Sequence, residues 1–307
     1  MAVYTTHTVA YPAASDPRHA LDLYIPHGAG PSSALLVYIH GGAWRSESKE
    51  DFVNTLVPRL LKHTGVPLAV LEYRLAPSSP HPAQINDVLS GLSLLTGAVL
   101  DAEGGSPKWD RQKLFVAGHS AGAFMAASLV LRPPSPPPAS PSASTNEPHT
   151  ALHSFAVPRA IRRHIFGIIC IDGIYDLPSL LAEYPSYHYF VDDAFGTDAE
   201  VLAAESPARW GLHEDDEREG RRVRVLVLHS REDELLSLRQ PRVFLRQLRQ
   251  LYVAGAGGQK SADEPVEGNE ERDLPDNVEV DFDSVTGTHE GLLDTEELAK
   301  VIALRLR

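Results

Sequence analysis

Cysteine is almost absent from this sequence, and so are the segments that mark secretion or membrane insertion. The one cysteine among 307 residues, Cys170, has no partner for an internal disulfide, so a disulfide-stabilised secreted fold is not expected. The first residues lack the basic start and the apolar stretch of a signal peptide. No apolar run approaches the roughly 20 residues that a membrane-spanning helix needs. We therefore expect a soluble, cytoplasmic protein with no membrane partner.

Clusters of basic side chains are scarce as well. The formal net charge is −13, and residues 261–283 contain ten Asp or Glu against one Arg. Proteins that bind nucleic acid place clustered Lys and Arg against the phosphates. The charge pattern therefore argues against nucleic acid or an anionic membrane as the main partner.

Short apolar runs alternate with segments of helical period. The runs are 35–39, 68–72, 114–118, 165–171, 223–229 and 278–282, and the helical segments are 87–95, 244–252 and 291–306. This alternation predicts an α/β fold with a mostly parallel sheet and helices on both faces.

Two segments interrupt this alternation. A Pro/Ser-rich loop occupies 132–149, and an acidic insertion occupies 255–277. Both have the composition of solvated or extended segments. Each lies between elements of the same predicted sheet, so we expect a single domain over 1–307.

The segment GHSAG joins a predicted strand to a predicted helix. Ser120 stands between Gly118 and Gly122, whose lack of a side chain lets the strand and the helix approach closely. A serine at a helix start is often only an N-cap. A G-x-S-x-G pattern between a strand and a helix, however, is the sequence of a nucleophile elbow. We therefore interpret Ser120 as a candidate nucleophile that needs a base and an acid.

Two later loops offer that base and acid. HSREDELLS follows the fifth apolar run and contains Glu232, Asp233 and Glu234, and GTHEGLL follows the sixth and contains His289. A serine hydroxyl is a poor nucleophile until a histidine oriented by a carboxylate removes its proton. The order serine, acid, histidine is the one that a nucleophile elbow of this kind uses. We predict a triad of Ser120, Asp233 and His289, with Glu232 and Glu234 as solvated or capping residues.

The glycine-rich segment YIHGGAW follows the first apolar run. Acyl transfer places negative charge on a former carbonyl oxygen, and backbone N–H groups must stabilise it. We expect these donors from Gly41 or Gly42, from Ala43, and from Ala121 beside the nucleophile. The chain lacks the His and Cys spacings of a metal site, so no metal and no cofactor are expected.

HGGAW, GHSAG, HSREDELLS and GTHEGLL together resemble the α/β-hydrolase superfamily, and EYRLAP (72–77) resembles its hormone-sensitive-lipase-like esterase branch. HGGAW and HSREDELL are more similar to fungal kynurenine formamidases (arylformamidases). The resemblance implies hydrolysis of N-formyl-L-kynurenine to L-kynurenine and formate, in tryptophan catabolism by the kynurenine pathway towards NAD synthesis. A homodimer is implied by the resemblance alone.

Four alternatives stay open at this point. Trp44 could stack on the aromatic half of a substrate or belong to the core, and the aromatic segment 184–190 could line the pocket or pack on itself. A carboxylesterase acting on small esters would use the same triad. A non-catalytic relative that binds a small ligand is the fourth alternative, although Ser120 and His289 both stand in intact motifs.

Overall fold

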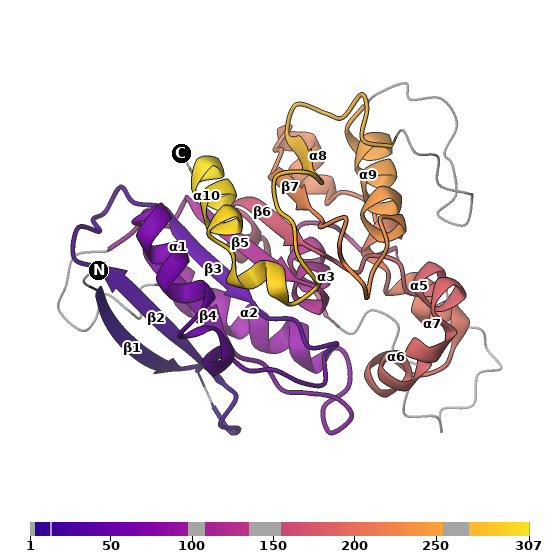
Figure 1. Ribbon diagram of the computed structural model, residues 1–307, viewed down its shortest axis with the longest axis horizontal. Helices are drawn as coiled ribbons and strands as arrows, with labels where there is room; N and C mark the ends of the chain where they lie inside the picture. Colours follow the sequence, from indigo (N-terminus) through magenta and orange to yellow (C-terminus); the bar gives the residue numbers. More distant parts are fainter. Residues whose placement is uncertain (1–3, 13, 98–107, 135–154, 254–269, 307) are drawn as a thin grey trace.

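The central feature of the molecule is an eight-stranded sheet with the order β1-β2-β4-β3-β5-β6-β7-β8 (Figure 1). The computed structural model describes residues 4–12, 14–97, 108–134, 155–253 and 270–306. The strands are β1 (Tyr4–Ala10), β2 (Ala20–Pro26), β3 (Leu35–Ile39), β4 (Leu68–Leu71), β5 (Leu114–His119), β6 (Ile165–Ile171), β7 (Arg224–Leu228) and β8 (Val278–Asp281). Strand β2 is antiparallel to both of its neighbours, and all other pairs are parallel. The prediction of an α/β fold with a mostly parallel sheet is therefore confirmed.

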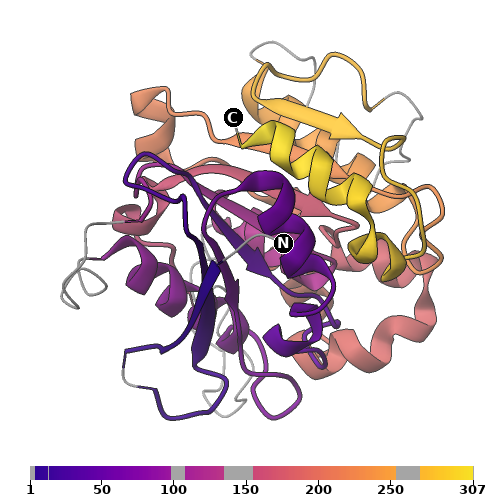
Figure 2. The same cartoon turned by 60° about the vertical axis from the view of Figure 1, so that its left-hand side comes forward.

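Helices cover both faces of this sheet. They are α1 (Leu56–Thr64), α2 (Ala83–Thr96), α3 (Ala121–Ser128), α4 (Arg159–Arg162), α5 (Leu177–Glu183), α6 (His188–Phe195), α7 (Ala199–Ala204), α8 (Glu214–Glu219), α9 (Arg239–Tyr252) and α10 (Glu296–Arg305). Short 3-10 turns are η1 (Lys49–Phe52), η3 (Pro185–Tyr187), η4 (Pro207–Arg209) and η5 (Gly291–Asp294). Helices α1 and α10 lie side by side on one face (Figures 1 and 2), and α2, α3 and α9 pack on the other.

The two faces carry two hydrophobic clusters, which explains the continuous apolar runs of the sequence. Strands β3, β4 and β5 are buried along their whole length. A strand covered on both faces cannot alternate polar and apolar residues, because each side chain meets a helix. Within the described residues, no helix is both long and apolar enough to cross a membrane.

The structure adds elements that the hydrophobic pattern did not indicate. Strands β1 and β2 form an antiparallel edge, and most of β1 is exposed, so its sequence has no apolar run.

The helical segment predicted over 291–306 is divided into two elements. Thr295 accepts the backbone N–H of Leu298 and so caps α10, while Gly291–Asp294 forms η5.

The two interrupting segments lie largely outside the described residues, which omit 135–149 of the Pro/Ser-rich loop and 255–269 of the acidic insertion. The described end of the acidic insertion differs from the expectation of a solvated segment. Glu270 is fully buried and forms ion pairs with Arg246 at 2.9 Å and Arg249 at 3.0 Å. Burial of this carboxylate is possible because two guanidinium groups of α9 compensate its charge.

Candidate active site

Ser120 occupies the sharp turn between β5 and α3. Its φ is +52° and its ψ is −116°, a conformation that a residue with a side chain rarely adopts. A Cβ atom on Gly118 would lie 2.1 Å from the carbonyl oxygen of Gly122, and one on Gly122 would lie 2.1 Å from that of Ile39. Only glycine fits at either position. The turn brings α3 against the sheet and leaves Ser120 at the carboxyl end of β5.

His289 and Asp233 form the closest ionisable pair near this turn. The Nδ1 atom of His289 lies 2.8 Å from Oδ2 of Asp233, and both side chains are almost fully buried. The other oxygen, Oδ1, accepts the backbone N–H groups of Leu235 and Leu236 at 2.8 and 2.9 Å. The Asp233 carboxylate is therefore fixed on one side by its own loop and directed on the other side at His289.

This pair shifts the pKa of both partners. Burial raises the pKa of Asp233, but the hydrogen bond and charge of His289 outweigh burial and lower it. Burial lowers the pKa of His289, but the hydrogen bond and charge of Asp233 outweigh burial and raise it. The arrangement favours an ionised aspartate and a histidine whose positive form is stabilised.

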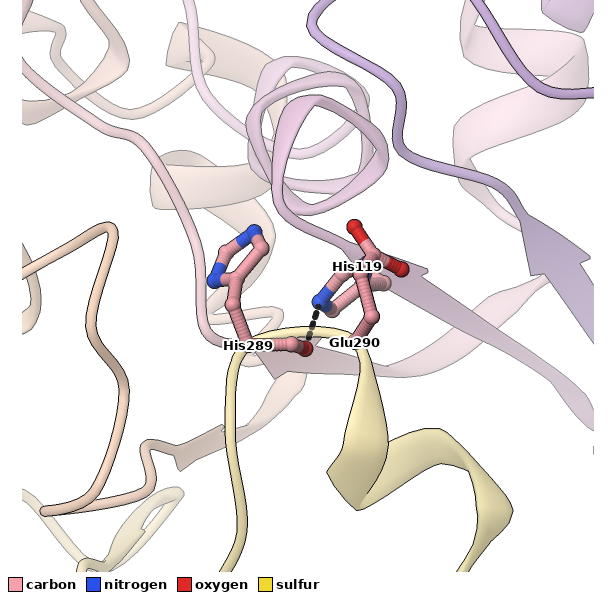
Figure 3. A group of neighbouring side chains, drawn as sticks. All are labelled: His119, His289 and Glu290. Carbon is pink, nitrogen blue, oxygen red and sulfur yellow. Dashed lines mark hydrogen bonds between the residues drawn. The ribbon is translucent and has the colours of Figure 1, made fainter.

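The backbone of His289 is also held in place (Figure 3). His119, the last residue of β5, lies 2.9 Å through its Nε2 from the carbonyl oxygen of His289. Glu234 accepts the backbone N–H of His289 at 2.9 Å, and Ser230 donates its hydroxyl to Gly287 at 2.6 Å. Glu234 was expected to be solvated or capping; it is exposed, yet it ties the acid loop to the histidine loop.

Two buried histidines act as loop anchors. Burial and the neighbouring His289 lower the pKa of His119 well below its ordinary value, so it is neutral and donates from Nε2. The Nε2 atom of His229 donates to the carbonyl of Leu236 at 2.9 Å, and burial also lowers the pKa of this histidine. Both residues orient loops through hydrogen bonds.

The loop after β3 has an unusual backbone. Gly42 and Ala43 have φ values of +77° and +50°. The N–H of Gly41 donates to Oε2 of Glu47 at 3.1 Å and so is not free for an oxyanion, although the sequence left Gly41 and Gly42 as equal candidates. The N–H groups of Gly42, Ala43 and Ala121 make no hydrogen bond within the described chain. These three are the available donors.

Trp44, the last residue of HGGAW, is fully buried. Its ring contacts those of Phe124, Phe190 and Phe195, with centroids 5.3, 6.3 and 4.9 Å away. It does not line the cavity beside Ser120. Of the two interpretations left open by the sequence, this position favours packing in the core over stacking on a substrate.

A cavity of about 220 Å³ opens beside the turn. Its lining residues are Gly42, Ala43, Ser46, Glu47, Ser120, Ile174, Tyr187, Tyr189, Phe190, Leu235, Leu236, His289 and Glu290. Ser120 and His289 therefore face the same space, although no hydrogen bond joins their side chains in the described structure. Tyr187, Tyr189 and Phe190 from η3 and α6 supply an aromatic wall, and the charged part of the lining is acidic.

Two groups of described side chains have the spacing of metal ligands. One is His119, His289 and Glu290 (Figure 3), and the other is Asp172, Asp233 and His289, with one ligand atom per residue within 4.8 Å of the others. Both groups contain His289. A cation at either group would bind a ring nitrogen of His289, either the one that contacts Asp233 or the free one. We treat both as parts of the Ser120 site, and the expectation that no metal is used stays a prediction.

Three site residues were not identified from the sequence. Glu47 and Glu290 line the cavity, and Asp172 lies behind the Asp233 and His289 pair. Asp172 carried a usable signal, because it directly follows the apolar run 165–171 and so had to lie at the same edge of the sheet as Ser120. No such sequence signal marks Glu47, because its position depends on the path of the loop after β3.

Known proteins match both the sequence and the fold. A family model described as alpha/beta hydrolase fold matches residues 36–140. The chain is 30% identical over 225 residues to the kynurenine formamidase of Scheffersomyces stipitis, an alignment that covers 69% of this chain and 77% of the relative. It is 33% identical over 218 residues to the kynurenine formamidase of Eremothecium gossypii, with the same coverage of 69% and 77%.

Among solved structures, carboxyl esterase 2 of Tuber melanosporum superposes with a TM-score of 0.63 at 16% identity, over 99% of this chain and 86% of that one. The esterase of Pyrobaculum calidifontis superposes with a TM-score of 0.62 at 17% identity, over 98% and 85%. At such low identity the superpositions describe the fold alone. The sequence matches, at 30% and 33% identity, also show the family. The chain is a hydrolase of the α/β-hydrolase fold and belongs to the kynurenine formamidase family.

Proposed function

We propose that this protein hydrolyses N-formyl-L-kynurenine to L-kynurenine and formate, with Ser120 as nucleophile, His289 as base and Asp233 as the acid that orients it. The observation that carries this function is the contact of 2.8 Å between His289 Nδ1 and Asp233 Oδ2, together with the cavity that both His289 and Ser120 line. The substrate is inferred from the fungal relatives, whose names are kynurenine formamidase.

Acylation begins at the Ser120 hydroxyl. Asp233 holds the proton of His289 on Nδ1, which leaves the lone pair of Nε2 free to accept the serine proton. The oxygen of Ser120 attacks the formyl carbon, and the negative charge formed on the formyl oxygen is stabilised by the N–H groups of Gly42, Ala43 and Ala121.

The amine half must leave as a neutral arylamine. The imidazolium of His289 therefore donates its proton to the amide nitrogen as the C–N bond breaks, and L-kynurenine departs from a formyl ester of Ser120. Water then attacks this ester, with His289 accepting a proton from the water and returning one to the Ser120 oxygen. The second half releases formate and restores the free enzyme.

The cavity suits the amine half of this substrate. An apolar cavity of about 150 Å³ accommodates benzene, so the 220 Å³ here admit one aromatic ring with a short chain. Tyr187, Tyr189 and Phe190 would face the ring. Glu47 and Glu290 are the acidic residues of the lining. Burial raises the pKa of both carboxyl groups, and a nearby ammonium group would favour their ionised forms. This lining therefore suits the ammonium group of an amino acid better than an anionic substituent.

The first test is steady-state hydrolysis of N-formyl-L-kynurenine by the purified protein, beside a small nitrophenyl ester and with Ser120→Ala as the blank. A kcat/KM for the formamide well above that for the ester supports the proposed function. Turnover of the ester alone would keep the triad and make the protein a carboxylesterase, which is the alternative function. No turnover of either would contradict both.

We further propose that residues 1–307 form one domain and that the protein acts as a cytoplasmic homodimer. The single sheet supports the first point, because every strand from β1 to β8 pairs with the next in its order. Sedimentation of the purified protein tests the homodimer, and fractionation of cells tests the cytoplasmic location.

A further inference from the structure

A second carboxyl group, that of Asp172, lies behind the pair of Asp233 and His289. Asp172 directly follows β6, and its φ of +41° turns the chain at the edge of the sheet where Ser120 follows β5. Its side chain is fully buried. One oxygen of Asp172, one oxygen of Asp233 and one ring nitrogen of His289 lie within 4.8 Å of one another. Two carboxyl groups therefore share the buried space behind one imidazole.

The hydrogen bonds of Asp172 are incomplete if its carboxyl group is ionised. Its Oδ1 accepts the backbone N–H of Ser230 at 2.8 Å, but its Oδ2 is buried and has no donor within the described part of the chain. A buried polar atom without a partner costs free energy, so such an atom requires an explanation.

The neighbouring ionisable groups do not supply the missing donor. His229 uses its Nε2 proton on a backbone carbonyl and turns its unprotonated Nδ1 towards Asp172 at a distance of 3.6 Å. His289 uses its Nδ1 proton on Asp233. The hydroxyl of Tyr175, the remaining ionisable neighbour, makes no hydrogen bond to Asp172. A proton on Asp172 itself is the simplest donor that satisfies the site.

Electrostatics place such a proton on Asp172 rather than on Asp233. Two adjacent carboxyl groups cannot both ionise easily in a buried site. Burial and the charge of Asp233 raise the pKa of Asp172 to about 8. The pKa of Asp233 is lowered despite its burial, because His289 donates to it. At neutral pH the proton therefore belongs to the carboxyl group that lacks the histidine.

We propose that Asp172 is a positioning residue that is protonated at neutral pH and donates its proton to Asp233. This hydrogen bond would hold the Asp233 carboxylate against His289 and keep a single negative charge behind the imidazole. The inference rests on the proposed function, in which Asp233 and His289 activate Ser120. Asp172 itself touches neither the substrate nor the reacting atoms.

Two substitutions separate the possible roles of Asp172. Asp172→Asn keeps an oxygen that accepts the N–H of Ser230 and an N–H that can donate to Asp233, as the protonated acid does. Asp172→Ala removes both. We expect Asp172→Ala to lower kcat roughly tenfold or more with little change in KM, because His289 is less well oriented. Asp172→Asn should keep most of the wild-type kcat.

The pH profile of nitrophenyl ester hydrolysis gives a readout that a purely structural role would not change. The wild-type profile of kcat/KM should show an alkaline step near pH 8, where Asp172 ionises, and Asp172→Asn should lack it. Glu47 and Glu290 also have raised pKa values. The step must therefore persist when both are changed to Gln.

Two results would overturn the role of Asp172. One is an Asp172→Ala variant as active as the wild type. The other is an Asp172→Asn variant whose acid limb moves to lower pH by about one unit, a shift worth about 1.4 kcal/mol. The second result would mean that the working enzyme has an ionised Asp172, because removal of a negative charge lowers the pKa of His289. A wild type that hydrolyses neither substrate would instead contradict the proposed function.

Infrared difference spectra keep the test independent of whether the Asp172 variants fold. The variant with Glu47→Gln and Glu290→Gln should lose a carboxylic-acid C=O band as the pH rises through about 8. Absence of that band would show that Asp172 is already ionised at neutral pH, and would contradict the inference.

Discussion

His119 donates its Nε2 hydrogen to the backbone carbonyl oxygen of His289 at 2.9 Å. The bond joins the residue that precedes Ser120 to the loop that carries the proposed base. Glu234 accepts the N–H of the same His289 and lies beside Asp233. Both backbone polar groups of His289 are thus held by side chains adjacent to the other two members of the proposed triad, so the geometry of the three residues is coupled.

His119 should therefore matter for activity without touching the substrate. We expect His119→Leu to lower kcat about tenfold, because a slight displacement of His289 is costly. It should also lower the free energy of unfolding by about 1 to 3 kcal/mol, because the buried carbonyl of His289 loses its partner. His119→Gln, which retains a donor, should lose less of both. Denaturant unfolding and steady-state kinetics on the two variants check this, and equal losses would contradict it.

Asp233→Asn should leave a folded protein with kcat reduced by a factor on the order of 10³ to 10⁴, because an amide no longer fixes the productive tautomer of His289. Glu232→Gln is the matched control, since Glu232 is exposed in the same loop. Circular dichroism reports the fold of both variants. Activity near that of the wild type in Asp233→Asn would transfer the acid role to Glu232 or Glu234.

The acid limb of the pH profile follows from the raised pKa of His289. The base must be neutral to accept the Ser120 proton, so kcat/KM should fall as the pH drops through the pKa of His289. We expect the midpoint to lie above the ordinary histidine value of about 6.5. A midpoint clearly below that value in the kcat/KM profile would mean that Asp233 does not stabilise the imidazolium in the free enzyme.

The acidic lining of the cavity predicts selectivity for a positively charged amine half. Glu290→Gln should reduce the ratio of kcat/KM for N-formyl-L-kynurenine to that for an analogue without the α-amino group by about tenfold, mainly through KM. The matched control is Glu297→Gln, which removes the same charge on the exposed side of α10. An unchanged ratio in Glu290→Gln would show that the ammonium group lies elsewhere.

The ion pairs of Glu270 predict where the acidic insertion contributes to stability. Glu270→Ala leaves Arg246 buried without this carboxylate, so the free energy of unfolding should fall by about 3 kcal/mol or more. Glu271→Ala, which breaks the more exposed pair with Arg242, should cost less than about 1 kcal/mol. Denaturant unfolding of the two neighbouring variants gives the comparison. Equal effects would mean that the burial of Glu270 is not maintained in solution.

The sequence by itself indicated the parallel part of the sheet and the nucleophile elbow. Strand β3, for example, has the same bounds as its apolar run, because a strand covered by helices on both faces must be apolar throughout. The turn at Ser120 was recognisable because two glycines at fixed spacing are a local steric requirement. Strand β1 was missed for the converse reason, since an exposed edge strand needs no apolar pattern.

Tertiary structure alone decided which polar groups meet. Asp233, and not Glu232 or Glu234, contacts the imidazole ring of His289, and Glu47 accepts the N–H of Gly41. These pairings depend on how loops from different strands cross at the edge of the sheet, which composition and period do not encode. Local patterns are set by steric and hydrophobic rules along the chain, whereas a catalytic geometry is set by contacts between residues far apart in it.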